Sequence, residues 1–133
     1  MGYSTRIQLY TVPGQVKYDA TRRLVLKGVD GIVFVADSLV VQREKNLISL
    51  KNLQINLAAH KKDIFHVPLV LQYNKRDLDE PGIPILSLET LENDLNRQLK
   101  VPSFPASALN GDNVVLTLKR VIALTIASFQ KRL

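Results

Sequence analysis

The spacing of hydrophobic positions predicts four strands in this chain. Polar and apolar side chains alternate over residues 6–12, which is typical of a strand with one covered face. Residues 32–36 and residues 69–71 are uninterrupted apolar runs, as expected of parallel strands that are buried on both faces. Residues 101–106 are short and contain two prolines, which place a strand at the edge of a sheet.

Helical spacing predicts four helices between and after these strands. They cover residues 18–27, residues 41–60, a stretch that follows the candidate N-cap Ser87, and a stretch that begins near Asn113. The side chains predicted to face the core are, in chain order, Leu24 and Val25; Leu47, Leu50, Leu53 and Leu57, with Ile48 and Ile55 beside them; Leu88, Leu91, Leu95 and Leu99; and Val115, Leu118, Ile122, Ile126 and Phe129.

The resulting order, β-α-β-α-β-α-β-α, predicts an α/β fold. Connections that contain a whole helix force neighbouring strands to run parallel, and right-handed crossovers place helices on both faces of the sheet. No internal repeat, low-complexity tract or linker interrupts residues 1–133, so we expect a single domain.

Composition narrows the classes of function. The chain has no cysteine, which removes disulfides, thiolate metal sites and cysteine nucleophiles, and fits a reducing cytoplasm. Its net charge of +6 favours anionic partners. The basic residues are scattered along the sequence, and only eight residues of the chain are Phe or Tyr, so nucleic-acid binding is not favoured. No apolar stretch is long enough to span a membrane.

The most informative stretch is Asn74-Lys75-Arg76-Asp77, which follows the apolar run 69–71. Ligands of open α/β sheets bind at the carboxyl ends of strands. There one carboxylate, Asp77, can accept both the N1–H and N2–H groups of guanine, whereas adenine would leave it half-paired. Asn74 can reach the purine edge, and the stem of Lys75 can lie over the ring. The pattern therefore predicts a guanine pocket.

Two further loops are expected at the same rim of the sheet. In the first, the backbone N–H of Gly14 suits a terminal phosphate, and Gln15 can orient an attacking water. In the second, the backbone N–H groups of Ser107 and Ala108 can face the purine carbonyl. Each loop alone is more often an ordinary turn, but together with the tetrad they point to one nucleotide site.

With these motifs in place, the chain resembles the small Ras-like GTPases, and specifically their bacterial MglA branch. The resemblance covers essentially the whole chain. Its most specific segments are residues 10–16, 18–20, 26–31, 34–38 and 72–78.

The resemblance implies a role for each of these sites. Residues 11–15 would be the switch-II motif, in which Gly14 senses the γ-phosphate and Gln15 aids hydrolysis. Asn74, Lys75 and Asp77 would hold guanine, and Ser107 and Ala108 would complete the pocket. Family members bind GTP or GDP with Mg²⁺, regulate cell polarity and gliding motility, and are activated by a Roadblock-fold partner of the MglB type. Thr11 stands where most Ras-like proteins have aspartate, a departure that the MglA branch shares.

The sequence also lacks the motif G-x-x-x-x-G-K-[ST], which cradles the α- and β-phosphates in this family. The resemblance thus assigns the chain to the carboxyl two-thirds of a GTPase domain, without its first strand, and we expect this chain alone to be inactive. Residues 6–12 and 32–36, which that strand normally separates, are expected to pair directly. The alternative is a GTPase-like interaction module without nucleotide turnover.

Overall fold

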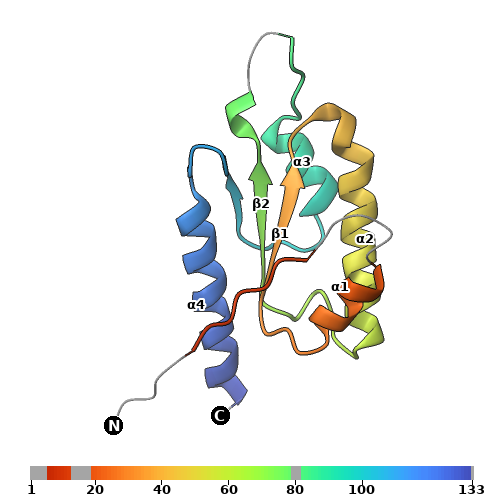
Figure 1. Ribbon diagram of the computed structural model, residues 1–133, viewed down its shortest axis with the longest axis vertical. Helices are drawn as coiled ribbons and strands as arrows, with labels where there is room; N and C mark the ends of the chain where they lie inside the picture. The colour runs from red at the N-terminus through yellow and green to blue at the C-terminus, as the bar shows by residue number, and fades with distance from the viewer. Residues whose placement is uncertain (1–5, 13–18, 79–81, 133) are drawn as a thin grey trace.

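The computed structural model describes residues 6–12, 19–78 and 82–132 of the chain, and Figure 1 shows how their elements are arranged. The elements, in chain order, are α1 (Asp19–Leu26), β1 (Ile32–Asp37), the 3-10 turn η2 (Val40–Gln42), α2 (Arg43–Ala59), β2 (Leu69–Asn74), the 3-10 turn η3 (Arg76–Leu78), α3 (Leu88–Leu95), β3 (Ser103–Pro105) and α4 (Val114–Arg132).

The three strands form one parallel sheet in the order β1-β2-β3. In its register Asp37, the last residue of β1, lies beside Asn74, the last residue of β2. Tyr73 in turn lies beside Pro105, the last residue of β3. The carboxyl ends of all three strands therefore meet at one rim, which follows from the parallel crossovers that the sequence predicts.

Helices cover both faces of the sheet, with α2 and α3 on one face and α4 on the other (Figure 1). The main core lies on the α2–α3 face, where Leu71 and Tyr73 of β2 pack with Leu57 of α2 and Leu91 of α3, each at most 1% exposed. On the other face, α4 lies across all three strands. The predicted three-layer α/β architecture is confirmed.

Residues 6–12 are not a strand, so the prediction of a strand there is wrong. No sheet hydrogen bond involves them among the residues that the structure describes, and Ile7, Leu9 and Tyr10 are 54%, 73% and 67% exposed. Alternating polarity suits a strand, but an extended segment becomes one only when a neighbouring backbone pairs with it.

The strand β1 is an edge strand, so its direct pairing with residues 6–12 is also a wrong prediction. Within the described ranges its only sheet neighbour is β2. Burial on both faces is likewise not observed, because Val35 is 54% exposed. An apolar run reports what a strand would bury in a wide sheet, and it cannot reveal how many neighbours that strand has.

The four helices form where predicted, but two of them turn a different face to the core. The inward residues of α4 are Thr117 and Val121, at 1% and 7% exposure, and the predicted stripe lies to the side. In that stripe Ile122 is half-buried and the others are 36–61% exposed, namely Val115, Leu118, Ile126 and Phe129. In α1, Leu26 is buried and Leu24 is 72% exposed.

The helices α2 and α3 follow the sequence more closely. Leu57 is buried, and Leu50 and Leu53 pack against the core as predicted, whereas Leu47, Ile48 and Ile55 are exposed. Leu91 and Leu95 of α3 are buried, Leu99 packs against the core, and Leu88 is 39% exposed. Ser87 caps α3 as predicted, because its hydroxyl accepts the N–H of Thr90 at 3.1 Å.

No helix in the described part of the chain is long and apolar enough to cross a membrane.

Candidate functional site

The rim at the carboxyl ends of the strands brings together five of the seven residues that the sequence singled out. Asn74 ends β2, and Lys75 follows it with a left-handed backbone, at φ 69°. Asp77 lies in the turn η3, while Ser107 and Ala108 follow β3. The turn η3 is tied to the segment after β3 by a bond from Arg76 N to Ala106 O at 3.1 Å.

Asn74 links the tetrad to the loop after β3. Its Oδ1 accepts the N–H of Ala108 at 2.8 Å, and its backbone oxygen accepts the N–H of Ser38 at 3.1 Å. Its Nδ2 has no hydrogen-bond partner among the described residues. Asn74 therefore connects to both neighbouring loops, through its side chain and its backbone, and its Nδ2 group is available as a donor at the rim.

The loop after β3 is closed by hydrogen bonds of its own. Ser107 is buried; its N–H donates to Asp112 O and its hydroxyl accepts the N–H of Asn110, both at 3.1 Å. In this structure the N–H groups of Ser107 and Ala108 thus both have protein partners. Binding of a purine carbonyl by either N–H requires it to exchange that partner.

Two rim residues escaped the sequence analysis. The ammonium of Lys75 contacts Asp37 Oδ2 at 2.7 Å, and the buried amide of Asn46 bonds the backbone of Asp37. The only sequence signals were a carboxylate at the end of β1 and one of the three asparagines in α2. Both contacts join residues that are far apart in the chain.

Asp77 differs from Asp37, an acidic residue at the same rim. In the described portion of the molecule its carboxylate makes no hydrogen bond or ion pair, whereas Asp37 is paired with Lys75. Asp77 is also partly buried. A partly desolvated carboxylate with free acceptor oxygens is suited to a ligand that presents two adjacent N–H donors.

A polar network beneath the rim joins β2, β3 and α3. The Tyr73 hydroxyl donates to Glu92 Oε1 at 2.6 Å, and Ser103 Oγ donates to the same oxygen at 2.5 Å. Burial raises the pKa of Glu92, but the hydrogen bonds that its carboxylate accepts outweigh burial and lower the pKa overall. Burial, and then donation to Glu92, raises the pKa of Tyr73. The network holds an ionised Glu92 and a neutral Tyr73, which stiffens the floor of the rim.

The remaining two residues of the expected site, Gly14 and Gln15, lie outside the described residues. The nearest described residue before them is Val12, and α1 begins after them at Asp19. Their expected contact with phosphate and water stays a prediction.

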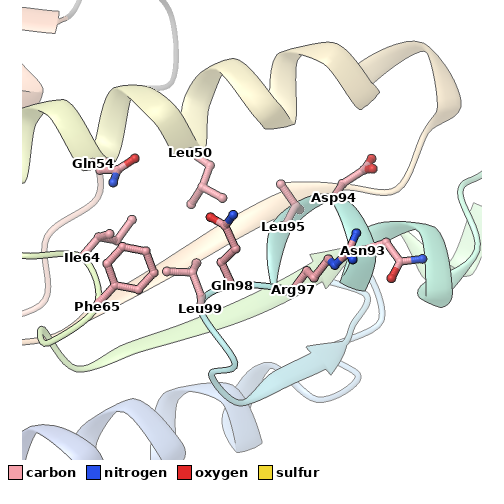
Figure 2. A pocket seen from close by; sticks show the side chains of 10 residues that line it. All are labelled: Leu50, Gln54, Ile64, Phe65, Asn93, Asp94, Leu95, Arg97, Gln98 and Leu99. Atoms are coloured by element: carbon pink, nitrogen blue, oxygen red, sulfur yellow. The ribbon is translucent and has the colours of Figure 1, made fainter.

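A separate hollow of about 260 Å³ lies between α2 and α3 (Figure 2). Leu50 and Leu95 contribute apolar walls, and Phe65 stands at one end with 51% exposure. Its only carboxylate, Asp94, is held by a two-point ion pair with Arg43 at 2.7 and 3.0 Å. None of the rim residues lines this hollow.

One known protein supports the resemblance. No protein-family model matches the chain. Over 130 residues, 98% of its length, the chain is 48% identical to the mutual gliding-motility protein MglA of Myxococcus xanthus (strain DK1622). The chain is thus similar in sequence to MglA. It spans 64% of the length of that relative, and its fold is the P-loop-GTPase-like α/β fold that an MglA-like sequence implies.

Proposed function

We propose that this MglA-like chain forms the guanine-binding part of a nucleotide-dependent switch, a small GTPase of the MglA type. The observation that carries the proposal is the junction at the rim, where Asn74 Oδ1 binds the N–H of Ala108 and the carboxylate of Asp77, three residues after Asn74, has no partner among the described residues. The tetrad thus presents an amide donor, a lysine stem and a free carboxylate at the rim, and Asn74 ties it to the loop after β3, which is distant in sequence.

This set of groups matches guanine better than adenine. Asp77 can accept two N–H groups of guanine, and adenine offers no group at the corresponding carbon. Adenine also has an acceptor at N1, so the carboxylate would receive no N–H group from it. A partly desolvated carboxylate left unpaired costs about 1–3 kcal/mol, which corresponds to roughly five- to 150-fold in affinity. The donor Nδ2 of Asn74 adds a contact to the purine edge.

Base discrimination by the whole chain tests the proposal. We would titrate isotope-labelled protein with guanosine and with adenosine and follow backbone amide shifts. Because the sequence contains no phosphate-cradling motif, nucleosides isolate the base pocket, and millimolar affinity is sufficient. We expect guanosine to shift the amides of Lys75, Asp77 and Ala108 while adenosine leaves them in place. Equal responses to both nucleosides would refute guanine recognition.

The substitution Asp77→Asn sharpens this test, because it replaces an acceptor by a donor. We expect it to weaken guanosine binding and to favour xanthosine, which carries a carbonyl at the position of the guanine amino group. Asp30→Asn, in the exposed loop that precedes β1 at the opposite end of the sheet, makes the same charge change away from the rim and serves as the matched control. An unchanged preference in the Asp77 variant would remove its assigned role.

Nucleotide turnover in the complete switch is a further part of the proposal. There Gln15 would orient the attacking water and Gly14 would contact the terminal phosphate, with Mg²⁺ accompanying GTP or GDP. The described residues contain no group of three His, Cys, Asp or Glu that could hold a metal ion, so we assign no magnesium ligand to them. We expect this chain with GTP and Mg²⁺ to release no phosphate above background. Release that Gln15→Leu abolishes would contradict that expectation.

The proposed cellular role follows the relative, whose name places it in gliding motility. We propose that the switch acts in the cytoplasm, regulates polarity or motility, and responds to a Roadblock-fold activating protein of the MglB type. Co-purification of the chain with such a protein, encoded in the same genome, tests the partner. Failure to associate in either nucleotide state would argue for a different regulator.

A further inference from the structure

The carboxylate of Asp37 holds the ammonium group of Lys75, and both of its oxygens have a hydrogen-bond partner. Oδ2 lies 2.7 Å from Lys75 Nζ, and Oδ1 accepts the N–H of Leu39 at 3.0 Å. The side chains of Asp37 and Lys75 are 25% and 42% exposed, so the pair is partly shielded from water. With both oxygens engaged, the carboxylate has a fixed orientation at the end of β1.

The backbone of Asp37 is fixed as well, by a side chain from α2. Asn46 Oδ1 accepts the N–H of Asp37 at 3.0 Å, and Asn46 Nδ2 donates to its carbonyl oxygen at 2.8 Å. Asn46 is only 7% exposed. A buried amide that bonds both groups of one residue does what a neighbouring strand would do, and it anchors Asp37 to the helix layer.

Lys75 is held at its other end by its own backbone. Its φ of 69° lies in the left-handed region, and its carbonyl oxygen accepts the N–H of Leu78 at 3.1 Å within η3. The four-carbon stem therefore runs between two fixed points, the loop after β2 and the carboxylate at the end of β1. A free lysine stem samples many rotamers, and their loss would oppose any ligand that needs one of them.

We propose that Asp37, set in place by Asn46, is a positioning residue for nucleotide binding: it holds the stem of Lys75 as a fixed apolar platform for the purine ring. The inference rests on the proposed function of the same rim and extends it to two residues outside the guanine-reading tetrad. The ion pair also neutralises the ammonium. Among the described residues of the tetrad and Asp37, the charges without an ion-pair partner are then the carboxylate of Asp77 and the guanidinium of Arg76, which donates to Leu86 O.

A purely structural role for the pair predicts a different pattern. Ion pairs with this degree of exposure contribute little to stability, and losing one alters folding only slightly. A positioning role instead couples Asp37 to Lys75 in ligand binding. The substitution Asp37→Asn keeps the size of the side chain and an acceptor for Leu39, but removes the charge that holds the ammonium.

A double-mutant cycle on guanosine binding is the test. It uses the whole chain and the variants Asp37→Asn, Lys75→Met and their combination, with amide-shift titrations giving each dissociation constant. We expect Asp37→Asn to weaken guanosine binding roughly fivefold, as for loss of a partly shielded ion pair. We expect no further weakening when it is added to Lys75→Met, because methionine needs no carboxylate to hold it. Urea unfolding of each variant verifies that it folds.

Two further readings separate the possible results. Side-chain relaxation of Lys75 in the free protein should show greater motion in Asp37→Asn, and Asn46→Ala should produce the same increase. If wild-type protein prefers guanosine but the two substitutions act additively, the positioning role is overturned and the guanine pocket stands. If wild-type protein does not distinguish guanosine from adenosine, the proposed function fails and this inference fails with it.

Discussion

The start of β1 packs so closely against α4 that adding a single methyl group there should measurably lower the free energy of unfolding. A Cβ placed on Gly31 would lie 2.1 Å from Thr125 Oγ1 and 3.4 Å from Val121 Cγ2. Such a contact cannot persist, so in Gly31→Ala either the threonine rotates or α4 moves away from the sheet. Rotation breaks the hydrogen bond from Thr125 Oγ1 to Val121 O, which measures 2.7 Å.

The magnitude follows from these two routes. Loss of that hydrogen bond costs about 0.5–1.5 kcal/mol, and overpacking of a core contact costs about 1–3 kcal/mol. Replacing glycine restores about 0.4–1 kcal/mol by restricting the unfolded chain. We therefore expect Gly31→Ala to lower the free energy of unfolding by about 1–2 kcal/mol. Because the chain has no tryptophan, urea unfolding followed by far-UV circular dichroism is the suitable assay.

Two companion variants make the reasoning refutable. Gly28→Ala is the matched control, because a Cβ there meets nothing within 4 Å, and it should be neutral or slightly stabilising. Thr125→Ala removes the clashing atom and should rescue Gly31→Ala, whereas Thr125→Val keeps a methyl in its place and should not. Equal stabilities for the alanine variants at positions 28 and 31 would show that α4 does not pack on the start of β1 in this way.

Three further outcomes are expected from single substitutions. The hydroxyl oxygen of Ser38 is the one buried side-chain nitrogen or oxygen atom without a hydrogen-bond partner among the described residues. Ser38→Ala should therefore leave the urea midpoint unchanged or raise it. Ser87→Ala removes the N-cap of α3 and should lower the free energy of unfolding by about 1 kcal/mol in the same assay, with a loss near zero arguing against the cap. Hydrogen bonds lower the pKa of Asp19 in the folded protein, and the one from Asn52 contributes most. Ionised Asp19 therefore stabilises the fold at pH values above its pKa in the unfolded chain, and this stabilisation is lost as the pH falls through its lower pKa in the folded protein. Asp19→Asn should therefore reduce the decline in urea midpoint on acidification, and an unaltered acid profile would contradict this.

The sequence predicted the part of the fold that depends on local pattern and crossover length. The apolar runs before Asp37 and Asn74 became β1 and β2, and the proline-containing segment became the edge strand β3. The prediction of a strand at residues 6–12 failed because a strand needs a neighbouring strand, and alternating polarity along one segment does not show whether such a neighbour exists. The tetrad was recognisable because its chemistry is concentrated in four consecutive residues.

Other features depended on contacts that no local pattern contains. The stripe from Val115 to Phe129 has ideal helical spacing, yet α4 turns Thr117 and Val121 to the sheet, because helix orientation depends on the strands beneath it. The partner of Lys75 lies 38 residues earlier in the chain, at Asp37. Long-range pairs of this kind are set by sheet register, which the structure supplies.

The edge of β1 has a consequence for how the protein behaves in concentrated solution. Ile32 and Ser38 direct their N–H groups to β2, so the intervening residues Val33, Val35 and Asp37 direct theirs away from it. Asn46 occupies both groups of Asp37. Among the described residues of β1, the ladder open to a foreign strand is therefore limited to Val33 and Val35. By shortening its own edge in this way, the chain limits runaway strand addition and the fibrous deposits that long, open edges promote.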